Sequence, residues 1–252
     1  MRRVRSLVAL LALFVVAVPA RLWAEAAVAD KPKAVTPAPQ TDSWAVKWWM
    51  PRHQEKVAGL KKQERVDLLM IGDSITHGWE GDGKKVWAEF YAKRNAYNIG
   101  FSGDRTEQVI WRLQNGAVEG IAPKLAVIMI GTNNAGHRKD KPEETAAGIR
   151  AILDELGRRL PQTKVLLLAI FPRAASSGDE LRKINDATNK LIAAYADHKR
   201  VFYLDLNDKF LQPDGTLTKE IMPDLLHPKE KGYRIWAEAM EPSIAELMGE
   251  SK

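Results

Sequence analysis

The sequence predicts a three-layer α/β protein built on a parallel sheet of five strands. From residue 66 onward, short apolar runs alternate with longer amphipathic stretches. The short runs are nearly continuous in Val, Ile and Leu, as strands buried on both faces are, and the longer ones have helical periodicity. Alternation of such strands with helices predicts βαβ units, whose sheets are parallel. A chain of 252 residues, 45% apolar and 28% charged, can bury such a core.

Each element can be placed along the chain. The expected strands cover 66–71, 96–99, 125–130, 164–170 and 201–204. The expected helices cover 85–93, 107–115, 142–159, 179–197 and 228–248. Ligands of parallel α/β sheets bind beyond the carboxyl ends of the strands, so the residues that follow each strand are candidates for function.

The N-terminus has the pattern of a secretory leader. Arg2, Arg3 and Arg5 precede an apolar run over 7–18, and small residues follow as far as Ala29. The run is shorter than the roughly 20 residues that cross a bilayer. We therefore expect a signal peptide over 1–29, a secreted or periplasmic protein, and no integral membrane span once the leader is removed. The absence of cysteine rules out disulfides.

Two further segments precede the main domain, which we expect over 63–252. Residues 30–42 carry prolines among Ala, Thr, Lys and Gln, a composition that predicts a flexible linker. Residues 43–62 begin with a capping serine, Ser43, and place Trp44, Trp48 and Trp49 near helical spacing, which predicts an N-terminal helical extension. Packing against the domain is the favoured role of these tryptophans, and a lid or a platform for stacking sugars is the alternative.

The net charge does not indicate a nucleic-acid partner. The formal charge is +6, but the leader holds half of it, and the other basic residues are interleaved with acidic ones over 56–65 and 138–141. Such patterns are typical of solvated faces rather than of a stripe that follows phosphates. We expect no nucleic acid among the partners, and the sequence does not indicate an oligomeric state.

The first chemical motif is Gly72-Asp73-Ser74, directly after the first expected strand. A turn at Gly72 can display the Ser74 hydroxyl at the edge of the sheet. The N-terminus of a following helical turn favours negative charge nearby. Gly-Asp-Ser alone is more often a turn or a helix cap, but its position after a buried strand favours a nucleophile.

Two more strand ends offer hydrogen-bond donors. Gly103 lies in the loop after the second strand, where the missing side chain lets its backbone amide approach a ligand. Asn133 follows the third strand, and its side-chain amide can donate to the same developing oxyanion. Either segment alone reads as a loop, with Asp104 as a helix cap. Together with Ser74 they predict a nucleophile beside an oxyanion hole.

The motif at 224–228, between the last strand and the last helix, supplies a base. A serine hydroxyl needs a base to take its proton, and the imidazole needs a carboxylate to orient it. His227, three residues after Asp224, meets both needs. His77 is the alternative base because it lies close to Ser74 in sequence. The histidines show no metal-ligand spacing, so we expect neither a metal nor a cofactor.

These four motifs, in this order and spacing, resemble blocks I, II, III and V of the SGNH, or GDSL-like, hydrolases. The residues that name the family match Ser74, Gly103, Asn133 and His227. The stretches 98–116 and 131–134 are similar to the catalytic subunits of intracellular platelet-activating factor acetylhydrolase, and the similarity covers about 67–240. Ser102, where that subfamily commonly has glycine, and the export leader are departures from it.

The resemblance implies a flavodoxin-like α/β/α sandwich and a Ser-His-Asp acyl-enzyme mechanism. Ser74 would attack an ester carbonyl while His227 accepts its proton and Asp224 orients the imidazole. The oxyanion would be held by the backbone amides of Ser74 and Gly103 and by the Asn133 side chain.

The resemblance also assigns supporting residues around this centre. We expect Asp73 and Asp104 to brace the loops from behind by capping neighbouring turns. In the acetylhydrolase-like subfamily the acyl site is walled at the positions of Ile75, Thr132 and Leu226. These side chains would leave little room beyond a methyl group, so acetyl esters are the expected substrates.

The sequence therefore predicts an exported serine esterase that hydrolyses short-chain, acetyl esters of a small molecule or a glycan. The alternative among enzymes is a carbohydrate O-acetylesterase acting on a polysaccharide or glycan. The alternative from another class is a non-catalytic sugar-binding or scaffold protein on a hydrolase fold, and the intact motif residues argue against it.

Overall fold

The computed structural model describes residues 31–250, and the expected signal peptide lies outside them. A parallel sheet of five strands forms the centre: β1 (Leu68–Gly72), β2 (Ala96–Gly100), β3 (Leu125–Met129), β4 (Lys164–Leu168) and β5 (Val201–Leu204). The strands lie in the order β2-β1-β3-β4-β5, which is the order of flavodoxin-like sheets. The expected parallel α/β fold is confirmed, and the strand boundaries differ from expectation by no more than two residues.

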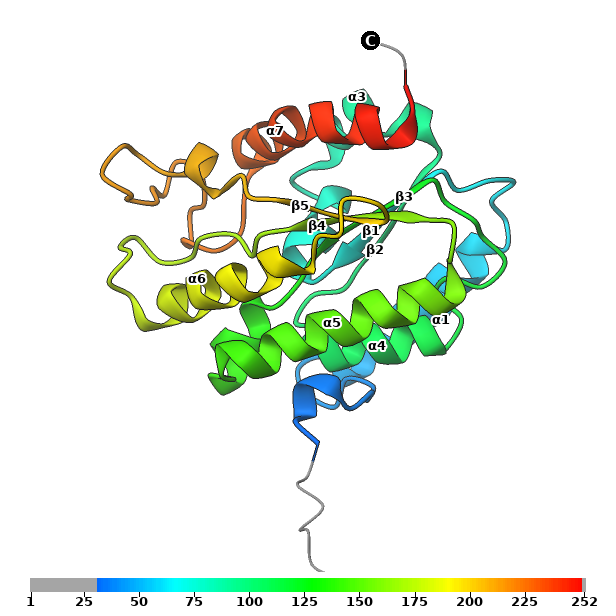
Figure 1. The fold of residues 1–252 in the computed structure, drawn as a ribbon, viewed down its shortest axis with the longest axis horizontal. Helices are drawn as coiled ribbons and strands as arrows, with labels where there is room; N and C mark the ends of the chain where they lie inside the picture. The colour runs from blue at the N-terminus through cyan, green and yellow to red at the C-terminus, as the bar shows by residue number, and fades with distance from the viewer. Residues whose placement is uncertain (1–30, 251–252) are drawn as a thin grey trace, which may run out of the picture. The chain divides into compact units, whose positions relative to one another are not determined.

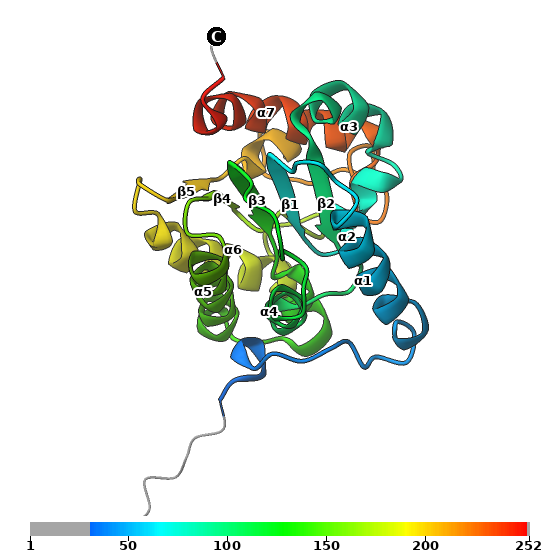
Figure 2. The same cartoon turned by 90° about the vertical axis from the view of Figure 1, so that its right-hand side faces the viewer.

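Helices cover both faces of the sheet (Figures 1 and 2). On one face lie α3 (Lys84–Phe90) and α7 (Glu230–Met248), and on the other lie α4 (Thr106–Gln114), α5 (Pro142–Arg159) and α6 (Glu180–Ile192). Two further α-helices are α1 (Val46–Leu60) and the single turn α2 (Ser74–His77). Short helical turns occupy η1 (Lys33–Val35), η2 (Gly78–Glu80), η3 (Ala92–Arg94), η4 (Asn134–Arg138), η5 (Ala193–Tyr195) and η6 (Asn207–Phe210).

Alternate residues of each strand enter two separate cores, as a pleated sheet requires. Met70 of β1 and Val127 of β3 pack in the cluster that includes α3 and α7. Ile71 of β1 and Ile128 of β3 pack in the cluster that includes α4 and α5. Burial on both faces explains why the strands read as continuous apolar runs.

Parallel pairing in register places the loops that matter side by side. Gly72, the last residue of β1, is paired with Gly100 of β2 and with Met129 of β3. The chain therefore leaves all three strands at the same edge of the sheet. The loops that carry Ser74, Gly103 and Asn133 follow directly. This edge includes the point between β1 and β3 where the strand order reverses, which is the usual ligand site of such sheets.

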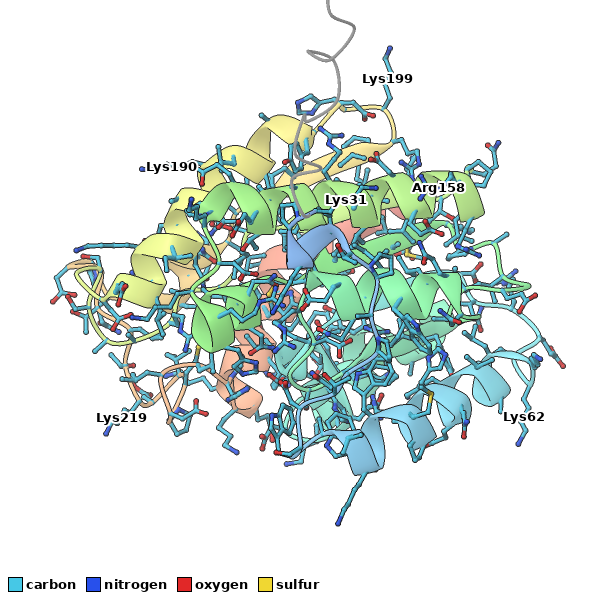
Figure 3. All side chains as sticks on the ribbon, turned by 90° about the horizontal axis from the view of Figure 1, so that it is seen from below. Lys31, Lys62, Arg158, Lys190, Lys199 and Lys219 are labelled. Atoms are coloured by element: carbon cyan, nitrogen blue, oxygen red, sulfur yellow. The ribbon has the colours of Figure 1, made fainter. Side chains whose placement is uncertain are left out.

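The N-terminal segment differs from the expected flexible linker. Ala34 is buried, and its carbonyl accepts a hydrogen bond from Thr106 Oγ1 at 2.8 Å. Figure 3 shows η1, just after Lys31, lying across α4 and α5. A Pro-rich segment cannot build a core of its own, but here it adds burial to the surface of two existing helices. Residues 31–42 are therefore docked on the domain.

The expected helical extension is present as α1. It begins at Val46 after a turn, with Ala45 rather than Ser43 at the N-cap position. Its tryptophans divide between two environments. Trp49 is buried, as expected of a core residue, whereas Trp44 is 53% exposed and Trp48 is half-buried.

The labelled basic residues are not gathered in one patch of the surface. In Figure 3 the labelled basic residues, Lys31, Lys62, Arg158, Lys190, Lys199 and Lys219, are scattered over the view instead of forming a stripe. Within residues 31–250, no helix is both long enough and apolar enough to cross a bilayer.

Candidate active site

Three side chains at the carboxyl edge of the sheet are joined by hydrogen bonds. Ser74 Oγ lies 2.8 Å from His227 Nε2. His227 Nδ1 lies 2.6 Å from Asp224 Oδ2. The geometry fits a histidine that donates from Nδ1 to the carboxylate and accepts at Nε2 from the serine hydroxyl. The structure thus brings together the expected nucleophile, base and orienting acid.

The loop that carries His227 is shaped by Asp224 itself. Asp224 Oδ1 accepts hydrogen bonds from the backbone amides of Leu226 and His227, at 3.1 and 2.7 Å. Leu225, which directly follows Asp224, has a left-handed φ of 58°, a conformation that costs a non-glycine residue about 1 to 2 kcal/mol. The Ala174 amide donates to the Leu225 carbonyl at 2.9 Å and secures this turn to the loop after β4.

The Asp224–His227 pair lies near the surface. The side chains of His227 and Asp224 are 41% and 56% exposed. Partial burial acts to raise the pKa of Asp224, but the hydrogen bonds from the His227 ring and backbone outweigh it and lower the pKa below its usual value. Asp224 is therefore ionised at neutral pH and available to orient the imidazole.

Ser74 opens the one-turn helix α2. The carboxylate of Asp73 caps this turn by accepting from the Ile75 amide at 3.0 Å, as expected of a bracing residue. Asp73 is completely buried, and this burial raises its pKa to about 7. At Gly72 a Cβ atom would lie 2.4 Å from the Met129 carbonyl oxygen, so only glycine lets the chain turn here against β3.

Candidate hydrogen-bond donors lie on the loops that leave the sheet at the same edge as Ser74. Within residues 31–250, no hydrogen bond occupies the backbone N–H of Ser74 or of Gly103. Gly103 has a φ of 78°, in the left-handed region that favours glycine. The Asn133 side chain donates one hydrogen to the Asp104 carbonyl at 3.0 Å, which leaves its second amide hydrogen for another acceptor.

Asp104 braces the same loop, but not as the expected helix cap. Its Oδ1 accepts from Trp49 Nε1 at 2.6 Å, and its Oδ2 from Arg112 Nε at 2.8 Å. The Asp104 and Arg112 side chains are completely buried. Burial raises the pKa of Asp104 to about 6, while the Arg112 charge and the Trp49 N–H limit the rise. The N-cap of α4 is Arg105.

His77, the alternative base, is engaged elsewhere. Its Nδ1 lies 3.0 Å from the Ser102 hydroxyl, whereas the hydrogen-bond partner of Ser74 is His227. Burial, aided by the positive charge of Arg52, lowers the pKa of His77 to about 4. His77 is therefore neutral at neutral pH. It lines a cavity of about 550 Å³ that opens beside Ser74 and is also lined by Glu80, Asp82, Ser102, Asp224, His227, Lys229 and Tyr233.

The three expected acyl-wall residues do not line this cavity. Ile75 is buried in the core that includes α3 and α7, because α2 directs it back onto the sheet, and Leu226 packs against the same core. The Thr132 hydroxyl accepts from Arg173 Nη1 and Asn185 Nδ2, each at 3.2 Å. These three side chains therefore do not form a common wall of this cavity.

Some residues around the site were missed by sequence reasoning. Arg112 had a signal, since a charged residue within the apolar pattern of a helix indicates a buried ion pair. Gln40, whose Nε2 donates to the Gly103 carbonyl at 3.3 Å, had none, because it lies in a segment without periodicity. Within residues 31–250, no group of three or more His, Cys, Asp or Glu side chains is placed to hold a metal ion.

A hydroxyl, an imidazole and a carboxylate linked in this order, beside unoccupied amide donors, is the arrangement found in serine hydrolases. The model of the GDSL-like lipase/acylhydrolase family matches residues 70–235, a range that contains Ser74, Asp224 and His227. The chain therefore belongs to this family and is an esterase of the GDSL/SGNH type.

Individual relatives agree with this assignment. The chain is 35% identical over 223 residues to the alpha1 subunit of platelet-activating factor acetylhydrolase IB from Homo sapiens, covering 87% of this chain and 92% of that one. Its fold is similar to that of a GDSL-like lipase from Bacteroides thetaiotaomicron, with a TM-score of 0.60, 23% identity and coverage of 78% and 97%. It is also similar to an acetylxylan esterase from Geobacillus stearothermophilus, with a TM-score of 0.56, 21% identity and coverage of 73% and 94%.

The environment of His77 predicts a dependence of stability on pH. The folded pKa is about 4 and the usual value is 6.5, so between these limits the unfolded chain binds a proton that the folded chain does not. Stability is therefore lost as the pH falls from about 6.5 to 4. In His77→Gln this contribution is absent, and the free energy of unfolding, measured by urea denaturation, should decrease less between pH 7 and pH 4.5 than in the wild type. An equal decrease in both proteins would contradict this account.

Proposed function

We propose that this protein is an exported serine esterase that removes short acyl groups, acetyl above all, through an acyl-enzyme. Ser74 Oγ adds to the ester carbonyl as its proton passes to His227 Nε2. The bond to the leaving oxygen then breaks, and His227 returns the proton to the departing alcohol. Water releases the acid in a second cycle in which His227 again acts as the base.

One observation carries this mechanism: the hydrogen-bonded series from Ser74 through His227 to Asp224, with distances of 2.8 and 2.6 Å. The oxyanion that forms beside Ser74 requires donors that are already in place. We assign this role to the backbone amides of Ser74 and Gly103 and to the second hydrogen of the Asn133 side chain. Export rests on the leader pattern at 1–29.

The preference for short acyl groups now rests on the cavity beside Ser74. Most of the residues that line it have polar or charged side chains, with Glu80, Asp82, Ser102 and Lys229 among them. A long alkyl chain placed there would remain in contact with water and polar groups, so its methylenes would gain little of the roughly 0.8 kcal/mol each that full burial provides. An acetyl group has no such methylenes to bury.

The nucleophile assignment is tested by Ser74→Ala. The variant should lose hydrolysis of p-nitrophenyl acetate by a factor of about 10⁴ or more, because removal of the hydroxyl leaves no group to form the acyl-enzyme. The thermal unfolding midpoint of the variant, compared with the wild type, serves as the control for folding. Unchanged turnover in a folded variant would refute the assignment, and an inactive wild type would favour a binding role.

The acyl preference is tested by comparing p-nitrophenyl acetate, butyrate and octanoate. We expect kcat/KM to fall from acetate to octanoate, since the cavity is open to water and charged groups such as Glu80, Asp82 and Lys229 line it, so that a long chain would not be fully buried. An octanoate value equal to or above the acetate value would show that an apolar acyl channel opens next to Ser74.

A second candidate is a carbohydrate O-acetylesterase, and a specific observation favours it. Trp44 and Trp48 remain exposed or half-exposed, with ring centroids 6.1 Å apart. Trp48 lies 6.2 Å, centroid to centroid, from His77, which lines the cavity beside Ser74. Exposed indole faces next to a polar cavity suit the apolar face of a sugar ring. The structurally similar acetylxylan esterase has the same fold.

The carbohydrate candidate is tested by Trp48→Ala. The variant should lose about tenfold in kcat/KM on acetylated xylooligosaccharides, equal to roughly 1.4 kcal/mol of lost stacking, and should keep its rate on p-nitrophenyl acetate, which has no sugar ring. The second substrate is the internal control. Equal rates of the wild type and the variant on the oligosaccharide would show that Trp48 does not stack on the sugar.

A further inference from the structure

The loop 101–104 contains the Gly103 amide assigned above to the oxyanion, and a glycine backbone is little restricted by its own sterics. Without a Cβ, a glycine can rotate about both backbone dihedrals at little cost, so its N–H points in one direction only if neighbouring groups restrain it. Small displacements of a donor strongly reduce its contribution to catalysis. The groups that hold this loop are therefore of functional interest.

The inner side of the loop is held by α4. Arg112 donates to the Asp104 carboxylate at 2.8 Å and to the Ile99 carbonyl at 3.0 Å. Its guanidinium also lies 4.1 Å from the ring centroid of Phe101. These contacts fix both ends of the loop but do not reach Gly103 itself.

The outer side of the loop is held by residues 40–49, which we call the N-terminal strap. Gln40 is 4% exposed, and its Nε2 donates to the Gly103 carbonyl at 3.3 Å. Its Oε1 accepts from the amides of Thr41 and Asp42, which fixes the orientation of the Gln40 side chain. The ring edge of Trp44 lies against Gly103, where a Cβ would come within 2.2 Å of it.

A second contact of the strap reaches both side-chain and backbone donors of the site. Trp49 is 1% exposed, and its Nε1 donates to the Asp104 carboxylate at 2.6 Å. The Asp104 carbonyl in turn accepts from Asn133 Nδ2 at 3.0 Å. Through Asp104, Trp49 therefore acts on the position of the Asn133 amide as well as on the loop of Gly103.

The strap is itself anchored independently of these contacts. Asp42 forms an ion pair with Arg105 at 3.1 Å. Upstream of the strap, the Ala34 carbonyl is bound by Thr106 at 2.8 Å. A segment secured on both sides of Gln40 can restrain the loop that it touches.

We propose that the N-terminal strap is part of the active site of this esterase, with Gln40 and Trp49 as positioning residues that align the Gly103 and Asn133 donors toward the oxyanion. The strap touches the outer side of loop 101–104 through buried polar contacts aimed at the backbone of Gly103 and the carboxylate of Asp104. A segment that only covered the domain would need apolar contacts alone. The inference rests on the proposed function, because it concerns the same oxyanion.

The test uses Trp49→Phe and Gln40→Met in the full chain, assayed with p-nitrophenyl acetate. Phe retains the aromatic packing of Trp49 and removes its N–H, and Met has a similar length to Gln without its amide. Each variant should lower kcat by about tenfold with KM within about twofold of the wild type, because the donors act on the transition state rather than on the bound ester. Leu191→Ala, at an exposed apolar residue of α6 outside both the strap and the site, is the control and should keep the wild-type kcat.

A double-variant comparison separates positioning from general stability. In an Asn133→Ala background the donor set is already incomplete, so Trp49→Phe should lower kcat by a smaller factor than it does in the wild type. The same factor in both backgrounds, or unchanged kcat in folded Gln40→Met and Trp49→Phe, would overturn the inference. If those variants are normal while Ser74→Ala is inactive, the proposed function stands and only this inference fails. If Ser74→Ala retains the wild-type rate, both fail.

Discussion

The register between β1 and its two neighbours is the constraint on which the rest of the site depends. Because Gly72 pairs with both Gly100 and Met129, the chain leaves β1, β2 and β3 at one level. Two to four residues later it reaches Ser74, Gly103 and Asn133. A slip of one residue would reverse the faces of every strand side chain and would move two donors away from the nucleophile. The two apolar cores therefore fix the chemistry as well as the fold.

Behind this edge lies a buried ion pair that is costly in stability but restrains the neighbouring loop. The Asp104–Arg112 pair is completely buried, and taking two charges out of water costs several kcal/mol per ion before pairing offsets it. The raised pKa of Asp104 shows that desolvation is only partly offset. The pair fixes the conformation of the loop. Asp104 accepts hydrogen bonds from Trp49 and Arg112, and Arg112 donates to the Ile99 carbonyl, so that one arrangement of the loop is allowed where apolar contacts would allow several.

The sheet could be predicted from the sequence because its strands have a strong local signal. Runs such as 125–130 are apolar without interruption, and the strand ends carry the motif residues, so both the fold and the Ser74–His227–Asp224 series were accessible. The direction in which a single side chain points could not be predicted from the sequence. Ile75 follows Ser74 directly, yet the first turn of α2 directs it into the core, as no periodicity over so short a helix could have indicated. Residues 31–42 lack any pattern, and their docking depends on surfaces of α4 and α5 that form only in the folded chain.

The exposure of the Asp224–His227 pair explains why their spacing of three residues matters. A carboxylate 56% exposed to water interacts weakly with an imidazole through charge alone, since solvent screens the attraction. The orientation of the ring must therefore come from geometry. Asp224 uses one oxygen to accept from the Leu226 and His227 amides and the other to accept from His227 Nδ1. One side chain thus shapes the turn and fixes the ring within it, and the left-handed Leu225 is the conformational cost of closing that turn in so few residues.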